Sequence, residues 1–308
     1  MQQVFSTQGS NSMMSFNGRL ALLALLCLAQ WISGGYSSGT DEAKEPVRFE
    51  ITLTWEDHEV AGLNRKTILS NGQFPGPILQ LQQGDDVEFV VKNQLPFSTT
   101  VHFHGIEQQG TPWSDGVPGL SQRPIESGDQ LIYRWSASQH GSYFYHAHRR
   151  GQIEDGLYGP IYIHPSKSVV RPFDKISDDP LERLLMHEAE RSTQPILLSD
   201  WRALTSEQIW RAEEASGFDA FCANAMLING KGSVQCLSED ILKAAETDAM
   251  KAVLERHTVS DTGCLWPSDI VEGDYFHNYT ALPETVFEGC TATKGEKEIL
   301  EVDPEVHW

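Results

Sequence analysis

Two pairs of histidines with His-x-His spacing are the residues best suited to chemistry in this sequence: His102 with His104, and His146 with His148. The residues around each pair are β-branched or aromatic, which is typical of strands. Side chains alternate between the faces of a strand, so the two histidines of each pair point the same way. If the two strands are neighbours, four imidazoles converge on one small volume. Imidazole binds copper, zinc, iron and nickel, so this pattern predicts a metal site.

A lone histidine in a strand is more often a hydrogen-bonded core or surface residue than a ligand, and this alternative applies to each member of the two pairs. Two pairs in short strand-like runs, separated by a turn-rich segment, nevertheless favour metal binding. The remaining histidines are isolated or stand at turns. We predict structural or solvent-exposed roles for His58, His140, His164, His187, His257, His277 and His307.

Short strand-like runs separated by turn residues occupy residues 47–164. The Asn-Gly pair at 71–72 and the Phe-Pro-Gly-Pro segment at 74–77 are examples of the turns. Strands this short and this closely spaced indicate an antiparallel β-sandwich, and no helical period competes with them here. We predict strands at residues 47–55, 86–93, 130–135, 142–148, 158–164 and 195–200.

Two helices are predicted after residue 200. Thr205 and Gln208 form a capping-box signature for a helix over residues 206–215. Ser238 can cap a second helix over residues 239–257, which has acidic residues in its first turn and basic residues in its last. The apolar stripe of this second helix predicts an insertion that covers its own domain, with docking of a partner as the alternative.

The N-terminus and the charge of the chain bear on its location. Arg19 precedes an apolar run at residues 20–32, which is the pattern of a secretory signal peptide, with a buried helix as the alternative. The run is shorter than the ~20 residues that span a bilayer as a helix. The formal net charge of −20 argues against nucleic acid and anionic membranes as partners. We therefore expect a secreted, extracellular protein with no membrane association after signal removal.

Four cysteines follow the predicted signal peptide, which suggests two disulfides in an exported protein. Three connectivities are open, and Cys222–Cys236 with Cys264–Cys290 is favoured because each bond closes a local loop. The Asn-Tyr-Thr segment at 278–280 is the one N-glycosylation sequon, so a glycoprotein is predicted.

The Trp-Ser-Asp-Gly segment at 113–116 and the Tyr-Phe-Tyr-His-Ala-His segment at 143–148 resemble the N-terminal copper signatures of multicopper oxidases. This family comprises laccases, ascorbate oxidases and ferroxidases built from three cupredoxin domains. The resemblance runs from near Val47 to the end of the chain. Residues 217–237, with Leu-Ile-Asn-Gly-Lys-Gly at 227–232, are most similar to fungal ascorbate-oxidase-like members, a group that includes oxidases associated with pigment synthesis.

The resemblance implies an all-β fold of cupredoxin-like Greek-key β-sandwiches, one complete and one incomplete with helical insertions. The expected organisation is a signal peptide and spacer at residues 1–40, a plastocyanin-like cupredoxin domain at 45–166, a linker at 167–185 and an incomplete second cupredoxin domain at 186–308.

The same resemblance implies a role for each candidate site residue. His102 corresponds to the type-2 copper ligand, while His104, His146 and His148 correspond to ligands of the type-3 copper pair. Asp115 corresponds to the catalytic acid that assists proton delivery during oxygen reduction, a task suited to a carboxylate near bound oxygen. A turn aspartate before a glycine is the alternative for this residue.

In the family, electrons enter at a type-1 copper and pass through a His-Cys-His segment to a trinuclear cluster with eight histidine ligands. No cysteine here precedes a histidine, so the type-1 site and half of the cluster ligands are absent from the 308 residues. The resemblance implies an oxidase that couples one-electron oxidation of a small reductant (phenol, ascorbate or ferrous iron) to reduction of dioxygen to water. We expect it to be truncated before the third domain and inactive as this chain alone. The alternatives are an inactive copper-binding cupredoxin fragment and a zinc site with three histidines and an open water position.

Overall fold

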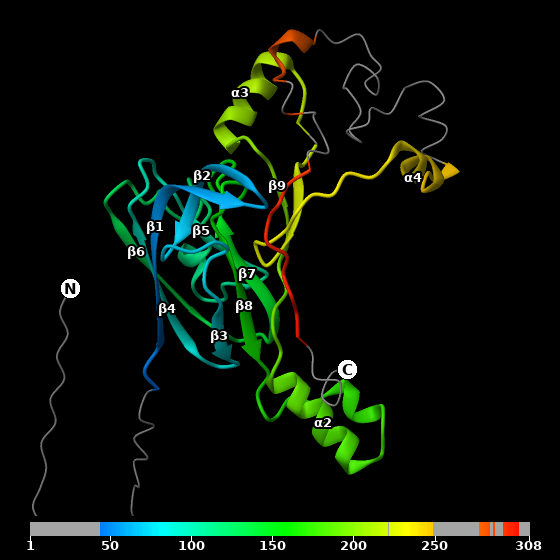
Figure 1. Cartoon of the computed structure of the whole chain (residues 1–308). Coiled ribbons are helices and arrows are strands. Elements are labelled where there is room, and N and C mark those ends of the chain that lie inside the picture. The colour runs from blue at the N-terminus through cyan, green and yellow to red at the C-terminus, as the bar shows by residue number, and fades with distance from the viewer. Residues whose placement is uncertain (1–43, 221, 249–276, 284–285, 287–291, 302–308) are drawn as a thin grey trace, which may run out of the picture. The chain divides into compact units, whose positions relative to one another are not determined.

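The computed structural model of the chain describes residues 44–220, 222–248, 277–283, 286 and 292–301 (Figure 1). The predicted signal peptide and spacer lie outside these residues. Eight strands form two four-stranded sheets that share one hydrophobic core, which confirms the predicted all-β sandwich. The first sheet has the order β2 (Leu63–Ser70), β1 (Val47–Val60), β4 (Asp86–Asn93), β6 (Gln130–Ser136), and the second has the order β3 (Leu79–Gln82), β8 (Tyr158–His164), β7 (Gly141–Ala147), β5 (Val101–His104).

The strand directions differ in part from the predicted antiparallel sandwich. β1 pairs with β4 in parallel, and β3 pairs with β8 in parallel, whereas the other pairs within the two sheets are antiparallel. Alternation along a strand reports which residues share a face and says nothing of strand direction, so the pattern could not reveal the parallel pairs. β2 and β3 were also not predicted, because β2 carries charged residues and β3 is only four residues long.

Alternation along β5 and β7 sends aromatic and small residues into the core and histidines to the other face. Val101 and Phe103 of β5 are fully buried, as is Tyr145 of β7. Phe103 packs edge-on against Phe89 of the opposite sheet, with ring centroids 5.1 Å apart. Burying an aromatic side chain stabilises the fold by about 1.5–3 kcal/mol. The same packing therefore fixes the direction in which the intervening histidines point.

All the α-helices in the described part of the chain follow β8. The capping box predicted for the helix after residue 205 is confirmed: Gln208 N–H donates to Thr205 Oγ1, and Thr205 N–H donates to Gln208 Oε1 at 2.9 Å. The elements of this region are η2 (Pro172–Lys175), α2 (Pro180–Arg191), β9 (Leu198–Trp201), α3 (Ser206–Ser216), β10 (Ala225–Ile228), α4 (Glu239–Ala244) and η3 (Tyr279–Ala281).

One prediction for this region needs correction. The helix predicted over residues 239–257 begins at Glu239, but α4 ends at Ala244 and residues 245–247 are not helical. Residues 249–257 lie outside the described residues. α2 spans residues on both sides of the predicted boundary between linker and second domain at 185/186, and that boundary stays a prediction. The start of α2 follows local rules, since Asp179 accepts a hydrogen bond from Leu181 N–H at 2.7 Å and Pro180 occupies the first turn.

A buried ion pair joins the sandwich to the segment after β8. Arg65 of β2 lies 3.0 Å from Asp155, and its guanidinium stacks over Trp201 at the end of β9, 3.8 Å from the ring centroid. Asp155 also accepts the backbone N–H of Ser206 at the start of α3, at 2.9 Å. The loop that follows β7 is therefore tied to both β9 and α3.

Cys222 and Cys236 are each disulfide-bonded. The predicted connectivity of the four cysteines stays a prediction, because Cys264 and Cys290 lie outside the described residues. Asn278 of the sequon is exposed and immediately precedes η3 as its N-cap. Within the described residues, no helix combines the length and apolarity that crossing a membrane requires.

Candidate metal centre

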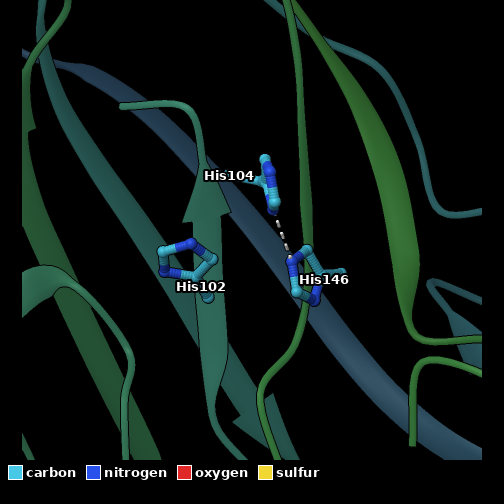
Figure 2. A group of neighbouring side chains, drawn as sticks. All are labelled: His102, His104 and His146. Carbon is cyan, nitrogen blue, oxygen red and sulfur yellow. Dashed lines mark hydrogen bonds between the residues drawn. The ribbon is translucent and has the colours of Figure 1, made fainter. Parts of the chain in front are cut away.

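The two histidine pairs lie side by side because β5 and β7 are neighbouring antiparallel strands. The register places His102 directly opposite His146, and His104 opposite Phe144. Figure 2 shows His102 and His104 projecting from one strand towards His146 on the next. The ring centroids of His102 and His146 are 5.3 Å apart. The convergence predicted for neighbouring strands is therefore present.

One nitrogen from each of His102, His104 and His146 lies within 4.8 Å of the others, which forms a candidate three-ligand group. The ring of His148 is 5.3 Å from that of His102 and 6.2 Å from that of His146. His148 lies one residue beyond the end of β7, so the predicted strand over residues 142–148 ends early. The fourth imidazole thus borders the group from an exposed position.

The spacing of the imidazole nitrogens suits a metal ion. His104 Nδ1 lies 3.3 Å from His146 Nε2 (Figure 2). Two nitrogens bound to one ion at about 2.0–2.1 Å with a tetrahedral angle lie about 3.3–3.4 Å apart. Imidazole donors with few competing carboxylates suit copper or zinc better than calcium or magnesium. The residues present therefore fit a copper ion.

A backbone carbonyl sets the orientation of His102. Its Nδ1 lies 2.6 Å from the backbone oxygen of Asp115 and 3.4 Å from the carboxylate Oδ1 of the same residue. A proton on Nδ1 donated to that carbonyl leaves Nε2 with its lone pair free, which is the arrangement typical of metal-binding histidines. Asp115 follows the short helix η1 (Pro112–Ser114) and is one-third exposed. It therefore lies at the end of η1 and adjoins the histidines, and its role stays a prediction.

Gly116 allows this approach. Its φ is +82°, and a Cβ at this position would lie 1.9 Å from the carbonyl oxygen of Val101 on β5. Only a residue without a side chain can press this loop so closely against the strand. Ser114 anchors the other side of the loop, because its Oγ accepts the backbone N–H of Arg134 on β6 at 3.0 Å.

His146 is held in the neutral state that binds metals. Burial, together with the neighbouring imidazoles of His102, His104 and His148, lowers its pKa to about 4, while a hydrogen bond to the Ala147 carbonyl opposes the shift. That hydrogen bond joins Nδ1 to the carbonyl oxygen over 2.8 Å. With the proton on Nδ1, Nε2 faces His104 as an acceptor of a metal ion or of a proton.

Phe144 is an aromatic residue of this site that was not predicted from the sequence. Phe144 stacks on His104 with ring centroids 4.8 Å apart and on His146 at 4.9 Å. Its ring limits the rotation of both imidazoles and shields one side of them from water. Its position two residues before His146 on β7 already placed it on the histidine face, and that spacing is the signal that could have identified it.

The other histidines in the described residues take part in contacts away from this group, as predicted. His187 pairs with Asp174 at 2.8 Å. His277 stacks on Phe218 with ring centroids 3.9 Å apart. His58 and His164 pack against Phe74 and Tyr162, and the carbonyl oxygen of His140 accepts from Tyr143; His257 and His307 lie outside the described residues.

A family profile described as multicopper oxidase matches residues 52–168, which contain all four histidines and Asp115. The laccase abr2 of Aspergillus fumigatus is 42% identical over 262 residues, covering 85% of this chain and 44% of the relative. A multicopper oxidase of Talaromyces pinophilus is 39% identical over 286 residues, covering 92% of this chain and 46% of the relative. This chain belongs to the multicopper oxidase family.

The chain spans less than half the length of these curated multicopper oxidases. Among solved structures, the laccase from Botrytis aclada is 27% identical, with a TM-score of 0.49 over 63% of this chain and 32% of that one. Fet3p, described as a multicopper oxidase that functions in iron import, is 29% identical, with a TM-score of 0.48 over 60% of this chain and 33% of that one. The two-sheet architecture and the family match together confirm the cupredoxin-like fold class.

Proposed function

We propose that His102, His104, His146 and His148 bind copper and form half of the trinuclear site of a multicopper oxidase. In this proposal His102 is the type-2 ligand, and the other three histidines bind the type-3 pair. The observation that carries it is the register of β5 and β7, which sets His102 opposite His146 and leaves His104 Nδ1 3.3 Å from His146 Nε2. Unlike a lone histidine, such a group has a spacing that one ion can satisfy.

The proposed activity of the whole protein is oxidation of a small reductant, one electron at a time, coupled to reduction of dioxygen to water. Candidate reductants are phenols, ascorbate and ferrous iron. Relatives named as laccases support this class of reaction. Copper held by the histidines would supply the redox chemistry for reducing dioxygen.

The residues of this chain would contribute orientation and protons. The Asp115 carbonyl holds the proton of His102 on Nδ1, so Nε2 stays available as a ligand. The Asp115 carboxylate, partly exposed and 3.4 Å from the same ring, can carry a proton between solvent and the site. Phe144 keeps the rings of His104 and His146 in place and covers one side of them.

These 308 residues contain no His-Cys-His segment, so we propose that they bind copper without turnover when tested alone. The proposed organisation is a cleaved signal peptide and spacer (1–40), a first cupredoxin domain (45–166), a linker (167–185) and part of a second domain (186–308) in a secreted, disulfide-bonded glycoprotein. The part of the linker occupied by α2 is helical.

Metal titration tests this proposal. The purified chain should bind Cu²⁺ more tightly than Zn²⁺, and substituting His102 or His146 with Ala should weaken Cu²⁺ binding by at least about tenfold. Oxygen consumption with a phenol or ascorbate should stay at the level of a copper-free control. Selective binding of Zn²⁺ would favour the zinc alternative, and unchanged Cu²⁺ binding after both substitutions would refute the site.

A further inference from the structure

Gln152 lies four residues after His148, is buried, and is not one of the proposed ligands. Its Oε1 accepts a hydrogen bond from Thr99 Oγ1 at 2.6 Å, and its Nε2 donates to the Ser98 carbonyl at 2.9 Å. Both ends of the amide are therefore used, and both partners precede the first histidine pair. The side chain joins the segment before His102 to the loop after His148.

Backbone hydrogen bonds bring the same residue back to the second histidine pair. The carbonyl of Gln152 accepts the N–H of Leu157 at 3.2 Å, and the carbonyl of Leu157 accepts the N–H of Ala147 at 2.9 Å. Ala147 separates His146 from His148. The loop after β7 thus folds back on itself. Two successive backbone hydrogen bonds, through Leu157, connect Gln152 to Ala147.

His148 needs such support more than the other three histidines do. It is exposed and stands beyond the last residue of β7, so the ladder between β5 and β7 does not include it. Its N–H donates to the Thr100 carbonyl at 3.3 Å, at the long end of the range for a hydrogen bond. Thr100 adjoins Thr99, which Gln152 holds. The His148 backbone and the Gln152 side chain therefore form hydrogen bonds with consecutive residues, Thr100 and Thr99.

We propose that Gln152 is a positioning residue for His148. By fastening the loop after β7 to Ser98 and Thr99, it holds the fourth imidazole beside His102, His104 and His146, where it can bind copper. The inference rests on the proposed copper site. Glutamine suits this place because its amide both accepts from a hydroxyl and donates to a carbonyl, which neither glutamate nor leucine can do.

Cu²⁺ affinity of the purified chain, measured by competition with a chromogenic chelator, tests the assignment. Gln152→Leu should weaken Cu²⁺ binding about tenfold, the lower end of the range for residues that orient metal ligands. Thr99→Val removes the hydroxyl that Gln152 accepts from while keeping the shape of the side chain, and it should act in the same direction. If Gln152→Leu does not fold, Thr99→Val decides the matter.

A remote glutamine provides the matched control. Gln83 donates through Nε2 to the Ser138 carbonyl at 2.9 Å and accepts the Ser166 N–H at 3.1 Å, so it makes the same kinds of bond outside the histidine group. Gln83→Leu should leave Cu²⁺ affinity within about twofold of the unsubstituted chain. A general loss of stability of the sandwich would lower the Cu²⁺ affinity of both Gln152→Leu and Gln83→Leu.

A second comparison separates positioning of His148 from other effects. In a chain that already carries His148→Ala, adding Gln152→Leu should cause no further loss, because the residue that it positions is gone. Unchanged affinity in Gln152→Leu, or a tenfold loss that persists in the His148→Ala background, would overturn the assignment. Absence of Cu²⁺ binding by the unsubstituted chain would instead overturn the proposed function itself.

Discussion

Arg65 Nη1 lies 3.0 Å from Asp155 Oδ1, and each of these side chains is only 5% exposed. Burial lowers the pKa of the Arg65 guanidinium, and the Asp155 carboxylate opposes that shift. Since Asp155 also accepts from Ser206 and Arg65 covers Trp201, this pair connects β2, the loop after β7 and the segment after β8. The loop that carries Gln152 is fastened at this point.

Breaking this pair should destabilise the fold strongly. Arg65→Met leaves the Asp155 carboxylate buried without its cation, and we expect the free energy of unfolding to fall by about 3–5 kcal/mol. Urea unfolding followed by tryptophan fluorescence measures the change. The control is Lys66→Met, which removes an exposed pair with Asp57 of the same 3.0 Å length and should cost less than about 1 kcal/mol. Equal losses in the two variants would contradict the role given to burial.

Gly116→Ala should weaken copper binding by moving the Asp115 carbonyl away from His102. The new Cβ would clash with the Val101 carbonyl, so the loop must shift. We expect Cu²⁺ affinity to fall about 10–100-fold, as for other losses of a hydrogen bond to a metal-binding histidine.

Gly110→Ala separates the clash from backbone strain. Gly110 has a φ of +79°, close to that of Gly116, but a Cβ there meets nothing within 4 Å. This control should lose about 1–2 kcal/mol of stability from its left-handed backbone and keep its Cu²⁺ affinity. If both variants lose affinity alike, the close approach of the Gly116 loop is not what orients His102.

The sequence was sufficient to predict that the histidines of each pair share one face, because strand alternation is a local property, whereas their convergence depended on β5 and β7 being neighbours. The i, i+2 spacing placed each pair on one face, and aromatic neighbours such as Tyr145 marked the strands. The capping box at Thr205 and Gln208 was likewise predictable from four consecutive positions. In each of these cases the residues that determine the structure are adjacent in the chain.

What escaped prediction depends on partners far apart in the chain. β2 was not predicted because it carries charged residues such as Arg65, whose partner Asp155 lies 90 positions later. The hydrogen bond from Thr99 to Gln152 joins residues 53 positions apart. The close approach of Gly116 to the Val101 carbonyl depends on the position of β5. α2 is different, because its N-cap Asp179 and Pro180 are local helix-start signals. The polar, proline-containing stretch around them was nevertheless interpreted as a linker.

Phe144→Leu should loosen the two imidazoles that its ring contacts. Leucine keeps an apolar side chain on the strand but removes the stacking on His104 and His146, so we expect Cu²⁺ affinity to fall about tenfold. Phe97→Leu removes an aromatic contact with Trp55 at 5.3 Å and serves as the control, which should bind Cu²⁺ normally. The chelator competition used for Gln152 measures both, and normal affinity in Phe144→Leu would show that the stacking does not orient the ligands.

The low pKa of His146 makes the copper-free chain sensitive to acid. The folded-state pKa is about 4 and the ordinary value is 6.5, so between these values the unfolded chain binds the proton and the folded chain does not. Stability from this residue is therefore complete above pH 6.5 and is lost as the pH falls towards 4, by up to about 3 kcal/mol.

His146→Gln removes this titration and isolates its effect from that of the many carboxylates. The difference in unfolding free energy between the unsubstituted chain and His146→Gln, measured in urea without metal, should shrink by up to about 3 kcal/mol from pH 7 to pH 4. The direction follows from burial, which penalises the imidazolium in the folded state. A difference that stays constant across this range would mean that His146 is protonated as readily in the folded chain as in the unfolded one. Protons would then compete with a metal ion for His146 no differently than for a free imidazole.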